Sequence, residues 1–333
     1  MGEYPVIREI REAAIVDRPE CPCCNALSDP RHLGTISYRD IWEALRSEWD
    51  ANFSEGVIRS NTPSETTELV ECVECGLQFF FPLAGGSDDF YRELGASPRY
   101  YLPWKWEFGW VSDRISPSME VLDVGCGKGD FLSRIRPLAR RAVGLEQNPS
   151  ARVAAGERGI EVFGESAERF SEEHSGTFDA VCAFHVVEHI PDPVSFLRHL
   201  LACLKPGGAL YVSVPNRARS YRAPREPLDC PPHHLTRWGP AQLLRLGALL
   251  ETPVREFAFE PVETSIPWGD LRDRIRRYAM KMPQGEILGT WLSRIVPRVV
   301  FLPPFVSLYR ACGMLERMGY YGGSMVARFA RPS

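Results

Sequence analysis

The chain has 333 residues, 44% of them hydrophobic and 25% charged, which is enough for one full α/β domain with additions. Its formal net charge of -4 gives no electrostatic reason to expect nucleic-acid binding. Residues 1–16 are charged and lack the apolar core of a secretory signal. Six of the ten cysteines are scattered, so we expect a reduced, cytoplasmic protein.

Three regions follow one another along the chain. Residues 1–112 contain two cysteine pairs and many aromatic side chains, and are predicted to form a separate subdomain. Residues 113–333 are predicted to form the main domain, with its clearest pattern before residue 216. Within this domain, we expect residues 264–321 to be a helical insertion that precedes the last strand.

The region after residue 112 alternates buried strands with helices. Strands are predicted at 120–125, 141–146, 160–163, 178–184 and 209–214, and helices at 130–138, 149–158 and 193–204. Further on, a helix is expected at 240–250 and strands at 252–260 and 323–330. This alternation predicts an α/β fold, in which helices cover both faces of a mainly parallel sheet.

A glycine-rich turn follows the first of these strands, with Asp123 before it and Gly125, Gly127 and Gly129 at alternate positions. Glycines let the backbone approach a ligand closely, and the amides that open the next helix favour a negative group. Glu146 ends the next strand, where a carboxylate can accept both hydroxyls of a ribose. The spacing differs from the dinucleotide pattern G-x-G-x-x-G, and the charge of Asp123 disfavours a pyrophosphate. The turn by itself is also compatible with a purely structural role.

Residues 121–130 resemble the first motif of the class I S-adenosylmethionine-dependent methyltransferases. Segments that resemble later motifs of this family follow in the family's order, at 146–149, 165–168, 178–181, 187–193 and 204–210. The resemblance implies a doubly wound, Rossmann-like sheet that binds S-adenosylmethionine.

The resemblance also implies roles for individual residues. The backbone around Gly125 and Gly127, in the turn that Gly129 completes, would hold the methionine part of the cofactor, with Asp123 near its amino group. Glu146 would bind the ribose hydroxyls. Three residues would border the adenine and one would lie beside the sulfonium: Gln147, Ser166 and Ala167, and then His185.

Cys21 and Cys24 form one C-x2-C pair, and Cys72 and Cys75 form another. Four thiolates match a closed tetrahedral zinc site, whose role would be folding and not chemistry. Cys23 leaves a second choice within the first pair, and unligated or redox-active cysteines remain an alternative. The arrangement resembles bacterial methyltransferases with an N-terminal zinc knuckle, many of which act on sugars, nucleotide-linked sugars or natural products. The aromatic residues that follow the knuckle either close over the cofactor or pack between the two domains.

Methyl transfer to a hydroxyl requires a base, and histidine is the first candidate near neutral pH. His189 follows the fourth strand, at the sheet edge where doubly wound folds bind ligands. His233 and His234 follow the fifth strand, and at most one of two adjacent residues faces the site if the segment is extended. Structural roles for all three histidines remain open, and a joint histidine–aspartate metal site is less favoured than a base.

The arginines at 217, 219, 222 and 225 either bind an anion or form a solvated charged surface. In the insertion, a basic helix is expected at 270–281 and an apolar stretch at 295–309. Arg298 and three prolines argue against a membrane-spanning helix there. A substrate lid or packing helices are favoured over contact with a membrane surface.

These observations predict O-methylation of a sugar or natural-product hydroxyl, with zinc as a structural metal and a small molecule as acceptor. Methylation of carbon or nitrogen, on a keto sugar, a nucleotide-linked sugar or an amine, is the alternative within enzymes. From a different class, a non-catalytic, zinc-bearing binding module is possible. The acceptor, the oligomeric state and the pathway stay open.

Overall fold

A computed structural model describes residues 19–219, 226–261 and 322–332. The predicted helix at 270–281, the apolar stretch at 295–309, and the arginines at 222 and 225 lie outside these residues. The described chain forms two sheets, one of four strands and one of seven. Within the described ranges, no helix is long and apolar enough to cross a membrane.

The smaller sheet is antiparallel, with the strand order β1-β2-β3-β9. Its strands are β1 (Arg31–Ser37), β2 (Thr66–Glu71), β3 (Gln78–Phe81) and β9 (Thr236–Arg237). The sequence therefore supplies the fourth strand from a position more than 150 residues after the third. The boundary between subdomain and main domain that we expect at residue 112 stays a prediction.

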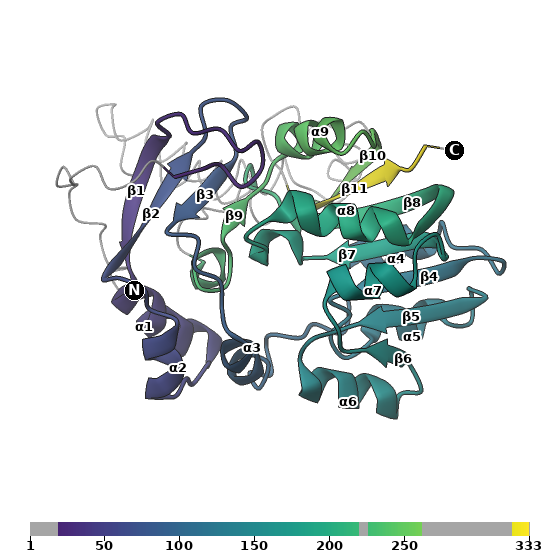
Figure 1. The fold of residues 1–333 in the computed structure, drawn as a ribbon. Coiled ribbons are helices and arrows are strands. Elements are labelled where there is room, and N and C mark those ends of the chain that lie inside the picture. Colours follow the sequence, from purple (N-terminus) through teal and green to yellow (C-terminus); the bar gives the residue numbers. More distant parts are fainter. Residues whose placement is uncertain (1–18, 220–225, 262–321, 333) are drawn as a thin grey trace, which may run out of the picture. The chain divides into compact units, whose positions relative to one another are not determined.

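Three helices accompany this sheet (Figure 1): α1 (Tyr38–Trp49), α2 (Glu55–Ser60) and α3 (Asp88–Leu94). In α1, Tyr38, Ile41, Trp42 and Leu45 are buried, at the spacing of one helix face. They form one core with residues of the sheet and of α3, among them Phe80 and Phe90. Apolar burial on this face thus holds the helices against the sheet.

The larger sheet has the order β10-β11-β8-β7-β4-β5-β6 (Figure 1). Its strands are β4 (Glu120–Val124), β5 (Arg141–Leu145), β6 (Glu161–Phe163), β7 (Phe178–Phe184), β8 (Leu204–Pro215), β10 (Val254–Phe259) and β11 (Ser324–Ala330). The five strands from β8 to β6 pair in parallel. The predicted doubly wound, Rossmann-like fold is confirmed, and its strand order reverses between β4 and β7.

Helices connect these strands and begin where their capping residues stand. They are α4 (Trp106–Ser112), α5 (Asp130–Ile135), α6 (Pro149–Glu157), α7 (Ala167–Glu173), α8 (Pro193–Cys203) and α9 (Pro240–Leu249), with short 3-10 turns η1 (Val187–His189) and η2 (Pro227–Asp229). The side chains of Asn148, Ser166 and Asp192 accept the first free amides of α6, α7 and α8. These caps place the start of each helix at the carboxyl edge of the sheet.

Aromatic side chains of α4 and α5 pack against Phe184 of β7. Phe131 of α5 lies 4.8 Å from the ring of Phe184, and Phe108 of α4 lies 5.1 Å from the same ring. All three side chains are at most 7% exposed. Edge-to-face packing of this kind is favourable beyond the area it buries. It holds the turn between β4 and α5 in one position.

Candidate cofactor and acceptor site

The glycine-rich turn lies at the point where the strand order reverses. Gly125, Gly127 and Gly129 all have positive φ, at +71°, +55° and +76°. A Cβ atom on Gly125 would lie 2.6 Å from the Cγ2 atom of Val186, which is closer than side chains tolerate. The turn therefore requires glycine both for its backbone conformation and for space.

Glu146 connects the glycine turn to the next strand. Its two carboxylate oxygens accept hydrogen bonds of 2.8 Å from the backbone amides of Gly127 and Asn148. Each oxygen retains a second lone pair, which can accept a ligand hydroxyl. The side chain is thus fixed in place before any ribose is bound.

Asp123 is the penultimate residue of β4, just before the turn, and is only 2% exposed. Its Oδ1 atom has no hydrogen-bond partner among the described residues. Burial raises the pKa of this carboxyl well above its usual value, although Lys105 opposes the shift. A buried acceptor without a donor is the complement of a cationic amino group, so this residue fits the cofactor that the sequence predicts.

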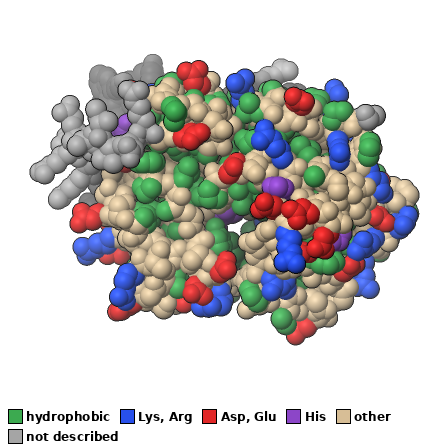
Figure 2. Space-filling view, viewed as in Figure 1, with side chains coloured by type: hydrophobic (Ala, Val, Ile, Leu, Met, Phe, Trp, Pro, Cys, Tyr) green, Lys and Arg blue, Asp and Glu red, His purple; other side chains and the backbone are tan. Residues whose placement is uncertain are grey.

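A cavity of about 590 Å³ opens at the carboxyl edge of the sheet. Six of the nine residues predicted to bind the cofactor line it: Gly125, Glu146, Gln147, Ser166, Ala167 and His185. Asp123, Gly127 and Gly129 are not among the residues that line it. Acidic side chains also line the cavity, and Figure 2 shows histidine and acidic groups gathered around a hollow in the visible face.

Three tyrosines form another wall of the cavity: Tyr91, Tyr100 and Tyr101. All three belong to the aromatic region that follows the cysteine pairs. A Cβ atom on Gly127 would lie 3.0 Å from the ring of Tyr101, so this ring covers the glycine turn. The Tyr101 hydroxyl lies 3.3 Å from Asn148 Nδ2, next to Glu146. The aromatic region thus provides cavity wall as well as packing, because Phe90 is fully buried in the core.

His189, His233 and His234 lie together although 44 residues separate the first from the second. Their ring centroids are 4.4 to 4.9 Å apart, and His189 also lines the cavity. We predicted that at most one of the two adjacent histidines would face the site; neither His233 nor His234 is among the residues that line the cavity, and this stays a prediction. The segment turns here, with the amides of both His233 and His234 donating to the carbonyl of Cys230, so both rings reach His189.

Backbone hydrogen bonds hold this segment against the end of β7. The amide of Leu235 donates to the carbonyl of Glu188 at 2.8 Å, and the amide of Phe80 donates to the carbonyl of Leu235 at 2.9 Å. Residue 235 therefore connects η1 to β3. This connection explains why the histidines at 233 and 234 lie next to the one at 189.

Buried carboxylates surround the histidine group. His185 adopts a positive φ of 55° and contacts Glu107 at 2.9 Å and Glu188 at 3.4 Å. Burial lowers the pKa of His185, but these two carboxylates outweigh it and raise the pKa above its usual value. His234 contacts Asp229 at 3.3 Å and Glu188 at 3.8 Å.

The pKa values of His189 and His233 are shifted in the opposite direction, below the usual value. Burial lowers the pKa of His189, and it lowers the pKa of His233 well below the usual value, with the neighbouring histidines adding to the effect. Both imidazoles are therefore neutral at neutral pH and keep a basic nitrogen. A neutral imidazole can accept a proton from an acceptor molecule.

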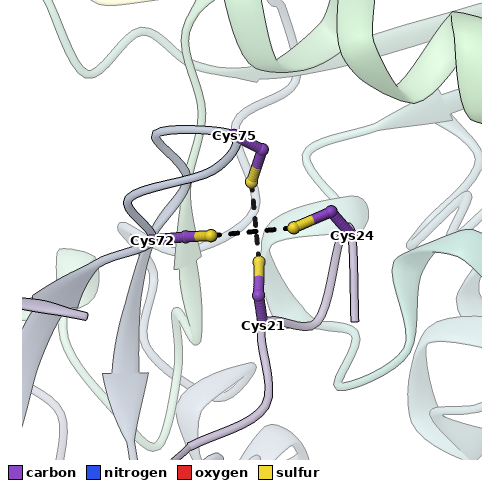
Figure 3. A group of neighbouring side chains, drawn as sticks. All are labelled: Cys21, Cys24, Cys72 and Cys75. Atoms are coloured by element: carbon purple, nitrogen blue, oxygen red, sulfur yellow. Dashed lines mark hydrogen bonds between the residues drawn. The ribbon is translucent and has the colours of Figure 1, made fainter. Parts of the chain in front are cut away.

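The four predicted metal ligands, Cys21, Cys24, Cys72 and Cys75, point toward one centre (Figure 3). The Sγ atoms of Cys21 and Cys75 are 3.5 Å apart, and those of Cys24 and Cys72 are 3.6 Å apart. Zinc–sulfur bonds of about 2.3 Å in a tetrahedron require sulfur separations of about 3.8 Å. The donor set therefore fits zinc.

Arg217, in the arginine-rich loop, contacts the cysteine region. Arg217 donates to the carbonyl of Gly76, in the second cysteine turn, and lies 3.8 Å from Glu71. This side chain supports the cysteine region. The proposed anion-binding role is not needed to explain its position.

Residues 107–252 match the family model described as a methyltransferase domain. Together with the observed strand order and glycine turn, this match supports the prediction that residues 107–252 form a class I, S-adenosylmethionine-dependent methyltransferase domain. A ubiquinone biosynthesis O-methyltransferase of Xanthomonas axonopodis is 36% identical over 115 residues, which are 32% of this chain and 48% of that protein. The chain thus spans about half the length of the curated relatives it matches.

Solved structures are also similar. The S-adenosylmethionine-bound structure of an amino pentose methyltransferase from Micromonospora echinaspora, involved in calicheamicin biosynthesis, is 30% identical over 32% of this chain and 48% of its own, with a TM-score of 0.29. A methyltransferase from Archaeoglobus fulgidus covers 67% of this chain and 94% of its own, at 17% identity and a TM-score of 0.42.

Proposed function

We propose that this protein transfers a methyl group from S-adenosylmethionine to a hydroxyl of a sugar or other small natural product. The observation that carries the proposal is the histidine group of residues 189, 233 and 234, which adjoins the cofactor cavity through His189. Two of the relatives are named as methyltransferases of a ubiquinone precursor pathway and of an amino pentose, which agrees with a small acceptor.

The cofactor would lie along the carboxyl edge of the larger sheet. The turn at Gly125 and Gly127 would hold its methionine part, Asp123 its amino group and Glu146 its ribose. Gln147, Ser166 and Ala167 would border the adenine, and His185 the sulfonium. When bound, the cofactor supplies an activated methyl carbon. The task of the protein is then to align the acceptor, exclude water and remove one proton.

The histidine group would perform the proton removal. A neutral His189 has a nitrogen that can accept a hydroxyl proton, and the nearby buried carboxylate of Glu188 would stabilise the positive charge that forms on that ring. The tyrosines at 91, 100 and 101 would cover the reacting groups and exclude water. The four cysteines would hold zinc as a structural ion, since a closed set of four thiolates leaves no position for substrate.

A product screen tests the proposal. The full-length protein is incubated with methyl-labelled cofactor and panels of sugars, nucleotide-linked sugars, phenols and amines, and the products are identified by mass spectrometry. Label on an oxygen supports O-methylation. Label on carbon or nitrogen selects the alternative acceptor chemistry, and no cofactor binding by calorimetry favours a non-catalytic binding module.

A further inference from the structure

Each of the three clustered histidines has its Nδ1 atom beside a hydrogen-bond acceptor. His189 Nδ1 donates to the carbonyl of His233 at 2.6 Å, and His233 Nδ1 donates to the carbonyl of Leu228 at 2.8 Å. His234 Nδ1 lies 3.3 Å from Asp229 Oδ1. Because carbonyl oxygens only accept, the first two rings carry their proton on Nδ1 and present the lone pair of Nε2.

This arrangement is the one that holds histidines in metal sites. There, the distal ring N–H typically donates to a carboxylate or a backbone carbonyl, which fixes the tautomer and orients the other nitrogen toward the ion. One nitrogen from each of the three rings lies within 4.8 Å of the other two. Metal–nitrogen bonds of about 2.0–2.1 Å require separations of about 3.3 Å in a tetrahedral site, so modest ring rotations complete the set.

The charge around the rings also favours a cation. Glu188 is fully buried and lies 3.4 Å from His185 Nδ1 and 3.8 Å from His234 Nε2. Asp229, 6% exposed, contacts the same ring. Two buried carboxylates in contact with the His234 ring supply negative charge that a divalent ion would offset.

We propose that His189, His233 and His234 form a second metal site, distinct from the four cysteines, which binds a divalent transition-metal ion. Three imidazoles with no thiolate suit ions of the zinc, cobalt or nickel type, and leave positions open on the ion. His189 is the member of this group that also lines the cavity.

The site extends the proposed function, and only its chemical role rests on that function. A hydroxyl bound to such an ion has a lowered pKa, as does metal-bound water. In that case the ion, and not a free imidazole, makes the acceptor hydroxyl acidic. The metal site itself does not depend on the identity of the acceptor.

Tyr100 provides a specific test. Its hydroxyl lies 3.1 Å from His233 Nε2, the nitrogen that would bind the ion, and it acts as the donor because Nδ1 carries the ring proton. Tyr100→Phe removes this competing hydrogen bond. We expect it to raise the affinity for the ion by about fivefold, a gain that misfolding does not produce.

The experiment uses the full-length protein loaded with one equivalent of zinc, which the thiolates take first. It is then titrated with Co2+ by calorimetry, without cofactor or acceptor. We expect one further ion to bind without the strong thiolate-to-cobalt absorption. In His189→Ala, the affinity for this ion should fall by roughly tenfold or more. His199→Ala, at another residue that lines the cavity, should leave it unchanged.

Absence of a second ion in the wild-type protein overturns the proposal, as does equal binding by His189→Ala. A loss in His199→Ala as large as that in His189→Ala also overturns it. Thermal unfolding of each variant shows that the fold is retained. Because no methyl transfer is measured, this result stays separate from the outcome of the product screen.

Discussion

The carboxylate of Glu146, at the end of β5, accepts a 2.8 Å hydrogen bond from the backbone N–H of Gly127, in the turn after β4. Glu146→Ala removes this bond and the expected ribose contact. We expect the dissociation constant for S-adenosylmethionine, measured by calorimetry, to rise by roughly 10- to 100-fold. Glu161→Ala, which removes an exposed partner of Arg141, serves as the control. Equal cofactor binding by the two variants would contradict the assigned role.

Gly125→Ala tests the need for close backbone approach. Its φ of +71° and the 2.6 Å contact with Val186 should together destabilise the fold and weaken cofactor binding. Gly176→Ala is a matched control, because its φ is +63° but its Cβ would meet nothing within 4 Å. The backbone penalty of about 1–2 kcal/mol should be common to both. Only Gly125→Ala should lose cofactor affinity; if Gly176→Ala loses as much, the effect is one of stability alone.

We expect the thiols of Cys72 and Cys23 to differ in their contribution to zinc binding and stability. Cys72→Ser should lower the zinc content by one ion per chain and reduce the melting temperature, because a structural zinc site contributes to folding. Cys23→Ser should retain both, since Cys23 is outside the group of four. Metal analysis and thermal unfolding measure the outcome. Zinc loss in Cys23→Ser alone would show that the first pair has been chosen wrongly.

His234 lies between the carboxylates of Asp229 and Glu188, and its ring centroid is 4.9 Å from that of His189, the expected base. His234→Gln should lower kcat by roughly 10²–10⁴-fold on the acceptor found by the product screen. The affinity for the cofactor should stay unchanged, because the predicted cofactor contacts are elsewhere. His199→Gln provides the control for a histidine that lines the cavity. Full turnover in alanine variants of all three clustered histidines would rule out their catalytic role.

Asp179 connects three strands, since its Oδ2 atom accepts from the Glu120 amide of β4 and from Lys205 of β8, both at 2.8 Å. Burial alone would raise the pKa of Asp179, but these partners lower it below the usual value. A lowered pKa gives stability that is present above the unfolded value, near pH 3.9, and lost as the pH falls through the folded value.

Asp179→Asn should therefore lower the free energy of unfolding by about 1 kcal/mol at pH 7 and reduce its decline below pH 4. Urea unfolding between pH 3 and pH 7 measures both effects. An unchanged acid dependence would show that other carboxylates control it.

The parallel strands were predictable because buried parallel strands are continuous apolar runs, as in β4 and β7. The smaller sheet was not predicted. Thr66–Glu71 contains four polar or charged residues and no long apolar run, and Thr236–Arg237 is a strand only through its pairing with β3. Such pairings depend on contacts between distant segments, which periodicity does not encode.

The chemistry-bearing residue types were visible in the sequence, but their mutual geometry was not. The turn at Cys230 brings His233 and His234 to the same side, whereas an extended strand would separate them. The contact of Tyr100 with His233 spans 133 residues, and no local pattern indicates it. The role of Glu188 as a buried carboxylate between two histidines likewise depends on the fold.

The two-residue strand β9 restricts which segments of this protein can be exchanged with those of a relative. It pairs with β3 in the cysteine-bearing sheet, and Leu235, just before it, joins η1, which contains His189, to β3. A chimaera that exchanged only the N-terminal region with that of a relative would leave β3 facing a foreign edge strand. Acceptor preference and zinc binding should therefore be inherited together, and a functional exchange must carry residues 228–238 along with the cysteines.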